Sequence, residues 1–235
     1  MQIDGVFAEI GTLCCRNHIR LQRLQNCKFV QDLDFFQTQN RPLFSFVYAC
    51  LEQLSAYLQQ NRNSESFSSE LDATIRKYNG DPLNFYPIFR ESFEISFKKF
   101  NSHIPIHPSY SLFKACQVFD PAYTCFGTIE RRNIRQYSMI RELAEPSEDL
   151  LREWSIYCGW DKSKLLGNLD LDQFWRGNIN HFPLLSNIAL NYIWLPISSC
   201  SVERSFSNYN NILSNDRQNL SENSLRSLNM LYFNK

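Results

Sequence analysis

Residues 174–233 read FWRGNINHFPLLSNIALNYIWLPISSCSVERSFSNYNNILSNDRQNLSENSLRSLNMLYF, and three helical patterns follow one another there. Pro196 and the polar run 214–219 separate them. In the first pattern, Pro183 suits the opening turn of a helix because its missing N–H costs nothing there. Apolar residues then recur at helical spacing until Pro196 ends the run; they are Leu184, Leu185, Ile188, Ala189, Tyr192 and Ile193.

The two later patterns have the same form. The serine-rich segment 198–201 can cap the second helix, and Ser221 can cap the third. Glu203 lies at the edge of the apolar stripe of the second helix, one residue after Val202. The two apolar stripes consist of Val202, Phe206, Tyr209 and Leu213, and of Leu225, Leu228 and Tyr232.

Motifs along this stretch resemble, in their order, the C-terminal dimerisation region of the hAT superfamily of DNA transposases. They are Phe174-Trp175, HFPLL at 181–185, LPISS at 195–199, SVERSFS at 201–207, NIL at 211–213, Arg217 with Leu220, and LYFN at 231–234. The resemblance implies helices left over from a ribonuclease H-like core. In that core the glutamate of the S-x-E-R-x-F-S segment is the last of three metal-binding carboxylates, and Glu203 takes its place here as a vestigial catalytic residue.

The resemblance further implies subunit pairing, with a second copy or a related hAT-derived protein as the partner. It implies an origin in a transposable element and a nuclear location; because the sequence has no strong basic localisation run, the cytoplasm is the alternative. The residues expected in dimerisation or packing are Phe174, Trp175, Phe182, Leu184, Leu185, Ile188, Leu195, Val202, Phe206, Tyr209, Leu213, Leu225, Leu228 and Tyr232.

Length and composition indicate a globular protein and argue against a membrane or secreted protein. The 235 residues are 43% hydrophobic with 19 Phe, which is ample for a core. No run approaches the ~18 to 20 apolar residues that span a bilayer, and the first residues show no signal-peptide pattern. Eight scattered cysteines favour reduced core thiols in a reducing compartment.

The charge balance argues against autonomous DNA binding. Lys and Arg number 24, as do Asp and Glu, and the longest basic runs are pairs. A free-standing DNA binder carries a basic stripe, because phosphate neutralisation supplies most of its affinity. A DNA-binding regulator is therefore the weakest alternative, and it would show a salt-dependent affinity.

Upstream, two helices are expected to form a core. The first begins at Pro42 and keeps an apolar stripe as far as Leu58. The second follows the turn Asn79-Gly80-Asp81-Pro82. Its aromatic stripe could stack on nucleic-acid bases, but helical spacing favours core packing; the stripe is Phe85, Phe89, Phe93, Phe97 and Phe100.

Three polar candidates upstream have ordinary structural explanations. Cys15 and His18 cannot by themselves complete a zinc site. His103 and His107 have no acidic or thiol neighbour in sequence and are expected to be loop histidines. Asp120 precedes Pro121, and an Asp-Pro pair is expected to cap or turn the chain rather than to catalyse.

Two further helices are expected over Glu130–Ala144 and Ser147–Cys158, the second with Ser147 as cap and with Leu150, Leu151 and Trp154 facing inward. The polar stretch 161–170 then leads into the C-terminal region. No long alternating run occurs, so the sequence predicts an all-α protein. We expect a helical region resembling the hAT insertion domain at 1–165 and the dimerisation region at 166–235.

Catalysis needs more acids than this pattern supplies. DNA cleavage in such a core uses two divalent ions, usually Mg²⁺, held by a cluster of carboxylates. The other two carboxylates of the family lie in a strand-rich half, and on this reading the chain begins after that half. We therefore expect a catalytically incomplete dimerisation module without a cofactor. The alternative is the C-terminal portion of an active transposase that uses Mg²⁺, with Asp120, Asp170 and Asp172 as the acids to compare with Glu203.

Overall fold

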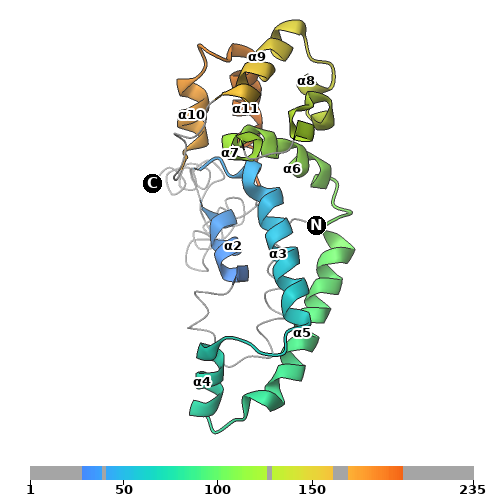
Figure 1. The fold of residues 1–235 in the computed structure, drawn as a ribbon, viewed down its shortest axis with the longest axis vertical. Helices are drawn as coiled ribbons and strands as arrows, with labels where there is room; N and C mark the ends of the chain where they lie inside the picture. The colour runs from blue at the N-terminus through green and yellow to red at the C-terminus, as the bar shows by residue number, and fades with distance from the viewer. Residues whose placement is uncertain (1–27, 39–40, 126–128, 161–168, 198–235) are drawn as a thin grey trace, which may run out of the picture. The chain divides into compact units, whose positions relative to one another are not determined.

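The structure, a computed structural model, describes residues 28–38, 41–125, 129–160 and 169–197 (Figure 1). Within those ranges all regular structure is helical and no strand occurs, which confirms the all-α prediction. The relation to a ribonuclease H-like core stays a prediction. The chain divides into two compact units, of which the second runs from Ser198 to Lys235. Every described residue belongs to the first unit.

Helices α3 (Val47–Arg62) and α5 (Pro82–His103) pack along each other (Figure 1). Helix α2 (Lys28–Gln37) also contacts α3, and a 3-10 turn, η2 (Phe44–Phe46), precedes α3 where the sequence predicted one helix from Pro42. The predicted apolar stripe of α3 is confirmed, because Val47, Leu51, Leu54 and Leu58 are all buried.

The aromatic stripe of α5 is core, as predicted. Phe89 and Phe100 are buried, and the other three phenylalanines of the stripe are half-buried. Phe93 meets Tyr57 of α3 edge-on with ring centres 5.7 Å apart. The stripe therefore packs inside this unit and leaves no aromatic platform for bases.

The predicted turn before α5 is also present. It ends α4 (Ser69–Lys77) with Asn79 in the left-handed region at φ 59°, and the N–H of Gly80 donates to the carbonyl of Ile75 at 3.0 Å. A Cβ on Gly80 would come within 2.8 Å of the Ile75 side chain, so a larger residue there would force that side chain to shift. Asp81 then caps α5 by accepting from the N–H of Leu83 at 3.1 Å.

Asp120 turns the chain between short elements. It follows α6 (Tyr110–Cys116) and the 3-10 turn η3 (Gln117–Phe119), and it precedes α7 (Pro121–Cys125). The N–H of Ala122 donates to its carboxylate at 2.9 Å. The predicted capping role of Asp120 is confirmed.

The predicted helix over 130–144 is wrong. Three short pieces stand there: η4 (Ile129–Arg132), η5 (Ile134–Tyr137) and α8 (Arg141–Ala144). Asn133 and Ile140 adopt extended backbone angles between the pieces, and Asn133 caps η5 through the N–H of Arg135. The buried residues recur at every third position, which suits 3-10 turns better than an α-helix; they are Ile134, Tyr137, Ile140 and Leu143.

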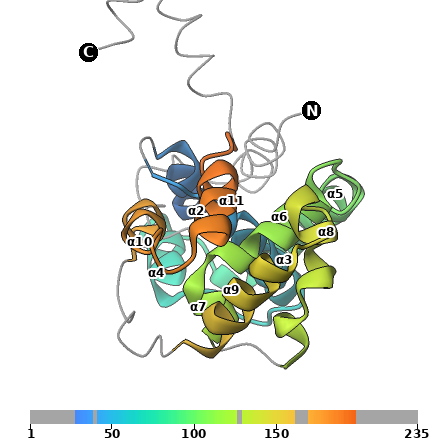
Figure 2. The ribbon, with the colours of Figure 1, turned by 90° about the horizontal axis from the view of Figure 1, so that it is seen from above.

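Helices α9 (Glu148–Gly159), α10 (Leu171–Gly177) and α11 (Pro183–Ile193) complete the unit (Figure 2). Ser147 caps α9, Asp170 caps α10, and Pro183 opens α11, the first and the last as predicted. Leu151, expected to face inward, is 40% exposed, so that prediction is wrong.

One hydrophobic cluster extends from Phe36 to Ile193, so the three helices share the core of the residues before them. Among the described cysteines, Cys50, Cys116 and Cys158 form no disulfide. A search of the described helices finds none with the length and apolar character of a membrane span.

Candidate dimerisation region: helices α9, α10 and α11

A buried carboxylate of α9 holds the first turn of α11. Glu153 is 8% exposed, and its two oxygens accept from the N–H groups of Leu184 at 3.1 Å and Leu185 at 2.8 Å. Helix α11 has no side-chain cap of its own, because Phe182 stands at its N-cap. The N–H groups of a first helical turn have no partner inside the helix, and its dipole favours a negative charge. Glu153 therefore caps α11 from another helix.

Two aromatic side chains of the same region reach the turn η3. The hydroxyl of Tyr157 donates to the carbonyl of Val118, and the indole N–H of Trp175 donates to the carbonyl of Phe119, each at 2.9 Å. Both aromatic residues are fully buried, and their ring centres lie 5.2 Å apart. Consecutive carbonyls of an irregular buried segment thus obtain partners from α9 and α10.

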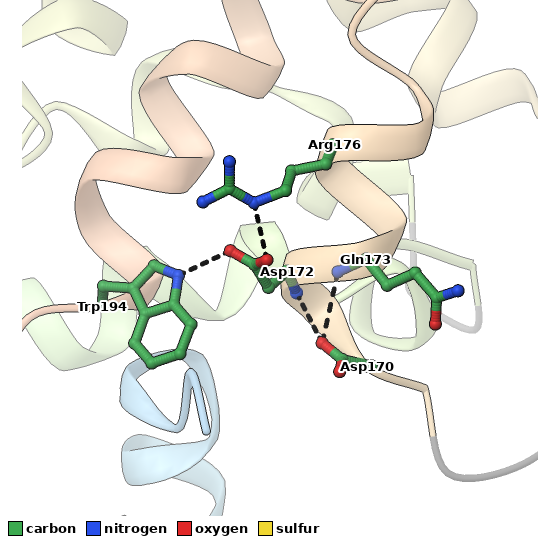
Figure 3. Close-up of polar contacts among 5 residues, drawn as sticks. All are labelled: Asp170, Asp172, Gln173, Arg176 and Trp194. Carbon is green, nitrogen blue, oxygen red and sulfur yellow. Dashed lines mark hydrogen bonds and ion pairs between the residues drawn. The ribbon is translucent and has the colours of Figure 1, made fainter. Parts of the chain in front are cut away.

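A third polar contact joins α10 to the residue after α11. The carboxylate of Asp172 accepts from Trp194 Nε1 at 2.7 Å and from Arg176 Nε at 2.6 Å (Figure 3). The hydrogen bond from Arg176 lowers the pKa of Asp172 below its ordinary value, and the same bond raises the pKa of Arg176. The neighbouring Asp170 accepts instead from the N–H groups of Asp172 and Gln173, as a helix cap (Figure 3).

Most of the predicted dimerisation and packing residues in the described chain are packing residues. The exposed fraction is 8% or less for Phe174, Trp175, Phe182, Leu185 and Ile188. Leu195 is half-buried, whereas Leu184 is 40% exposed and is the one of the seven with an open surface. The remaining predicted residues lie outside the described residues, as does Glu203; they are Val202, Phe206, Tyr209, Leu213, Leu225, Leu228 and Tyr232.

Sequence reasoning missed Glu153 because glutamate is rarely buried. A signal was present, since Leu150, Glu153, Trp154 and Tyr157 occupy one helical stripe and all are buried. Nothing in the sequence indicated that Trp194 and Asp172 would meet, because they belong to different helical patterns.

The described residues offer little chemistry beyond packing. No group of three potential metal ligands occurs within the described ranges. His103 Nδ1 lies 2.9 Å from the carbonyl of Lys99, and His107 Nδ1 accepts from the N–H of Ser109, so each histidine is engaged locally. Burial raises the pKa of the Cys116 thiol to about 12, which keeps it protonated at neutral pH. Cys15 and His18 lie outside the described residues.

The profile of the hAT family C-terminal dimerisation region matches residues 149–234. The match begins at the second residue of α9 and includes Glu153, α10 and α11. The boundary predicted between residues 165 and 166 falls in a stretch that the structure does not describe, and it stays a prediction. No curated protein and no solved structure matches the chain.

Replacing Glu153 with Gln should lower the free energy of unfolding by about 1–3 kcal/mol, because an amide oxygen can accept from only one of the two N–H groups. Urea denaturation followed by circular dichroism measures it. The control is Glu148→Gln in the same helix, whose side chain is 91% exposed and which should change stability by less than about 0.5 kcal/mol. Equal effects of the two changes would contradict the capping role.

Asp172→Asn should lower the free energy of unfolding by no more than about 1 kcal/mol at neutral pH. The loss is small because Arg176 is largely exposed and solvent weakens its ion pair with Asp172. The pKa of Asp172 is lowered on folding, so its contribution is present above its unfolded pKa of about 3.9 and is lost as pH falls. The stability difference between the wild type and the variant should therefore shrink below about pH 4. Thermal unfolding at several pH values tests this, and a pH-independent difference would refute it.

Proposed function

We propose that the chain pairs through residues 149–234, which match the hAT family C-terminal dimerisation region, with a second copy of itself or with a related hAT-derived protein. The observation that carries the proposal is the family match, which spans α9, α10 and α11. The chain is, on this proposal, a transposase-derived nuclear protein whose activity is association.

The packing of the three helices supports such a role. Glu153 holds α11 to α9, and Tyr157 and Trp175 hold α9 and α10 to the turn at Val118 and Phe119. A surface whose backbone is already fixed loses less conformational entropy when a partner binds. Helices α9 to α11 therefore offer a preorganised surface for association.

We further propose that this chain does not cut DNA and needs no metal for its role. The three aspartates most suited to accompany Glu203 have other functions in the fold. Asp120 and Asp170 cap short helices, and Asp172 pairs with Arg176 and Trp194. Each of the three carboxylates therefore has a structural role that does not depend on a metal.

The full chain should elute as a species of twice the single-chain mass in size-exclusion chromatography with multi-angle light scattering at micromolar concentration. Mass should fall toward that of one chain on dilution if pairing is reversible. A monomer at every concentration up to about 100 µM, with no related protein recovered as a partner, would refute the proposal.

The alternative, metal-dependent DNA cleavage, has one observation in its favour, since the matched region includes Glu203. Our proposal expects no Mg²⁺-dependent nicking of supercoiled DNA by the purified chain. Nicking that requires Mg²⁺, disappears in Glu203→Gln and persists in Glu148→Gln would establish the alternative instead.

A further inference from the structure

Exposed hydrophobic side chains are concentrated in the matched region. Six of the thirteen large hydrophobic side chains that are exposed among the described residues lie in the 41 described residues from Asp149 to Ile197. The other seven are spread over the much longer described part before it. The six are Leu151, Ile156, Trp160, Ile179, Leu184 and Trp194.

Three of these six stand where α9 meets the start of α11. Glu153 and Ile156 stand at i and i+3 on α9, and Glu153 binds the N–H of Leu184. Trp160 is the residue that follows the helix. The ring of Trp160 lies 5.1 Å from that of Phe182, two residues before Leu184. The first turn of α11 therefore adjoins the side of α9 that carries Ile156 and the residue Trp160 just after the helix; these side chains are 61% and 37% exposed. We call Ile156, Trp160 and Leu184 the apolar triad.

The described segments that carry the apolar triad contain few charged residues; Asp161, Lys162 and Lys164 follow Trp160 in the sequence and lie outside the described residues. In α9 the charged residues stop at Glu153, and the exposed ones pair with one another, since Arg152 lies 3.1 Å from Asp149 and 3.8 Å from Glu148. From Gly177 to Val202 the sequence has no Asp, Glu, Lys or Arg. His181, whose ring lies 6.2 Å from that of Trp160, is the one titratable side chain in the turn before α11.

We propose that the apolar triad is the centre of the contact with a second copy of this chain. The inference rests on the proposed function and adds the surface through which it acts. In a twofold pair the same patch lies on both chains, so a charged centre would meet its own sign. A neutral apolar centre avoids that repulsion, and a tryptophan among aliphatic side chains is typical of the residues that dominate binding energy.

The test measures the dissociation constant of the dimer by sedimentation equilibrium on the full chain. Ile156→Lys should weaken pairing at least tenfold, because it places a charge on each side of the contact, and Leu184→Gln should weaken it less. The control is Ile95→Lys on α5, where an isoleucine of similar character is 44% exposed outside the matched region. It should change the dissociation constant less than twofold.

The outcomes separate this inference from the proposed function. A wild-type chain that remains monomeric refutes the apolar triad as a contact between two copies, and it refutes the proposed function as well when no related protein is recovered as a partner. A wild-type dimer that Ile156→Lys leaves intact, or that Ile95→Lys weakens equally, refutes the apolar triad and leaves dimerisation standing. Thermal unfolding is recorded for each variant, and if Ile156→Lys does not fold, the dissociation constant of Leu184→Gln decides.

Discussion

The packing of α11 against α9 depends on one buried carboxylate. Glu153 places two oxygens against the N–H groups of Leu184 and Leu185, at the start of a helix whose own N-cap is a phenylalanine. Burying a charge is costly unless hydrogen bonds replace its lost water, and here two charge-assisted bonds and the helix dipole do so. The contact joins α9 to α11 at a turn where Leu185 is buried and Leu184 is 40% exposed.

The need to pair buried polar groups also explains the hydrogen bonds made by the buried aromatic residues. Short 3-10 turns leave carbonyls that a continuous helix would have paired, and such groups are costly when buried. Tyr157, Trp175 and Trp154 donate to the carbonyls of Val118, Phe119 and Arg132 respectively. Each ring thus fills the core while its polar atom satisfies the backbone, which is why the short turns at 117–119 and 129–132 pack against regular helices.

This division between core and surface gives the matched region two kinds of residue. Side chains such as Trp175 and Leu185 are buried in their own chain and set the positions of the helices. Leu184, Ile156 and Trp160 remain exposed and carry the contact that we infer for a second copy. The motif residues of the family and the residues of an interface are therefore largely different sets in the described part of the chain.

The sequence by itself determined the helical class through its periodicity, and it determined the turn at Asn79–Pro82 and the capping roles of Ser147 and Asp120 through their residue types. Each of these features depends on residues that are close together in the chain. The sequence did not reveal the break at Asn133 or the outward position of Leu151. Nor could it reveal the contacts of Glu153 with α11 or of Trp194 with Asp172, which join residues 22 or more positions apart. Those contacts depend on how helices pack, and helical spacing shows which residues share a face but not what that face meets.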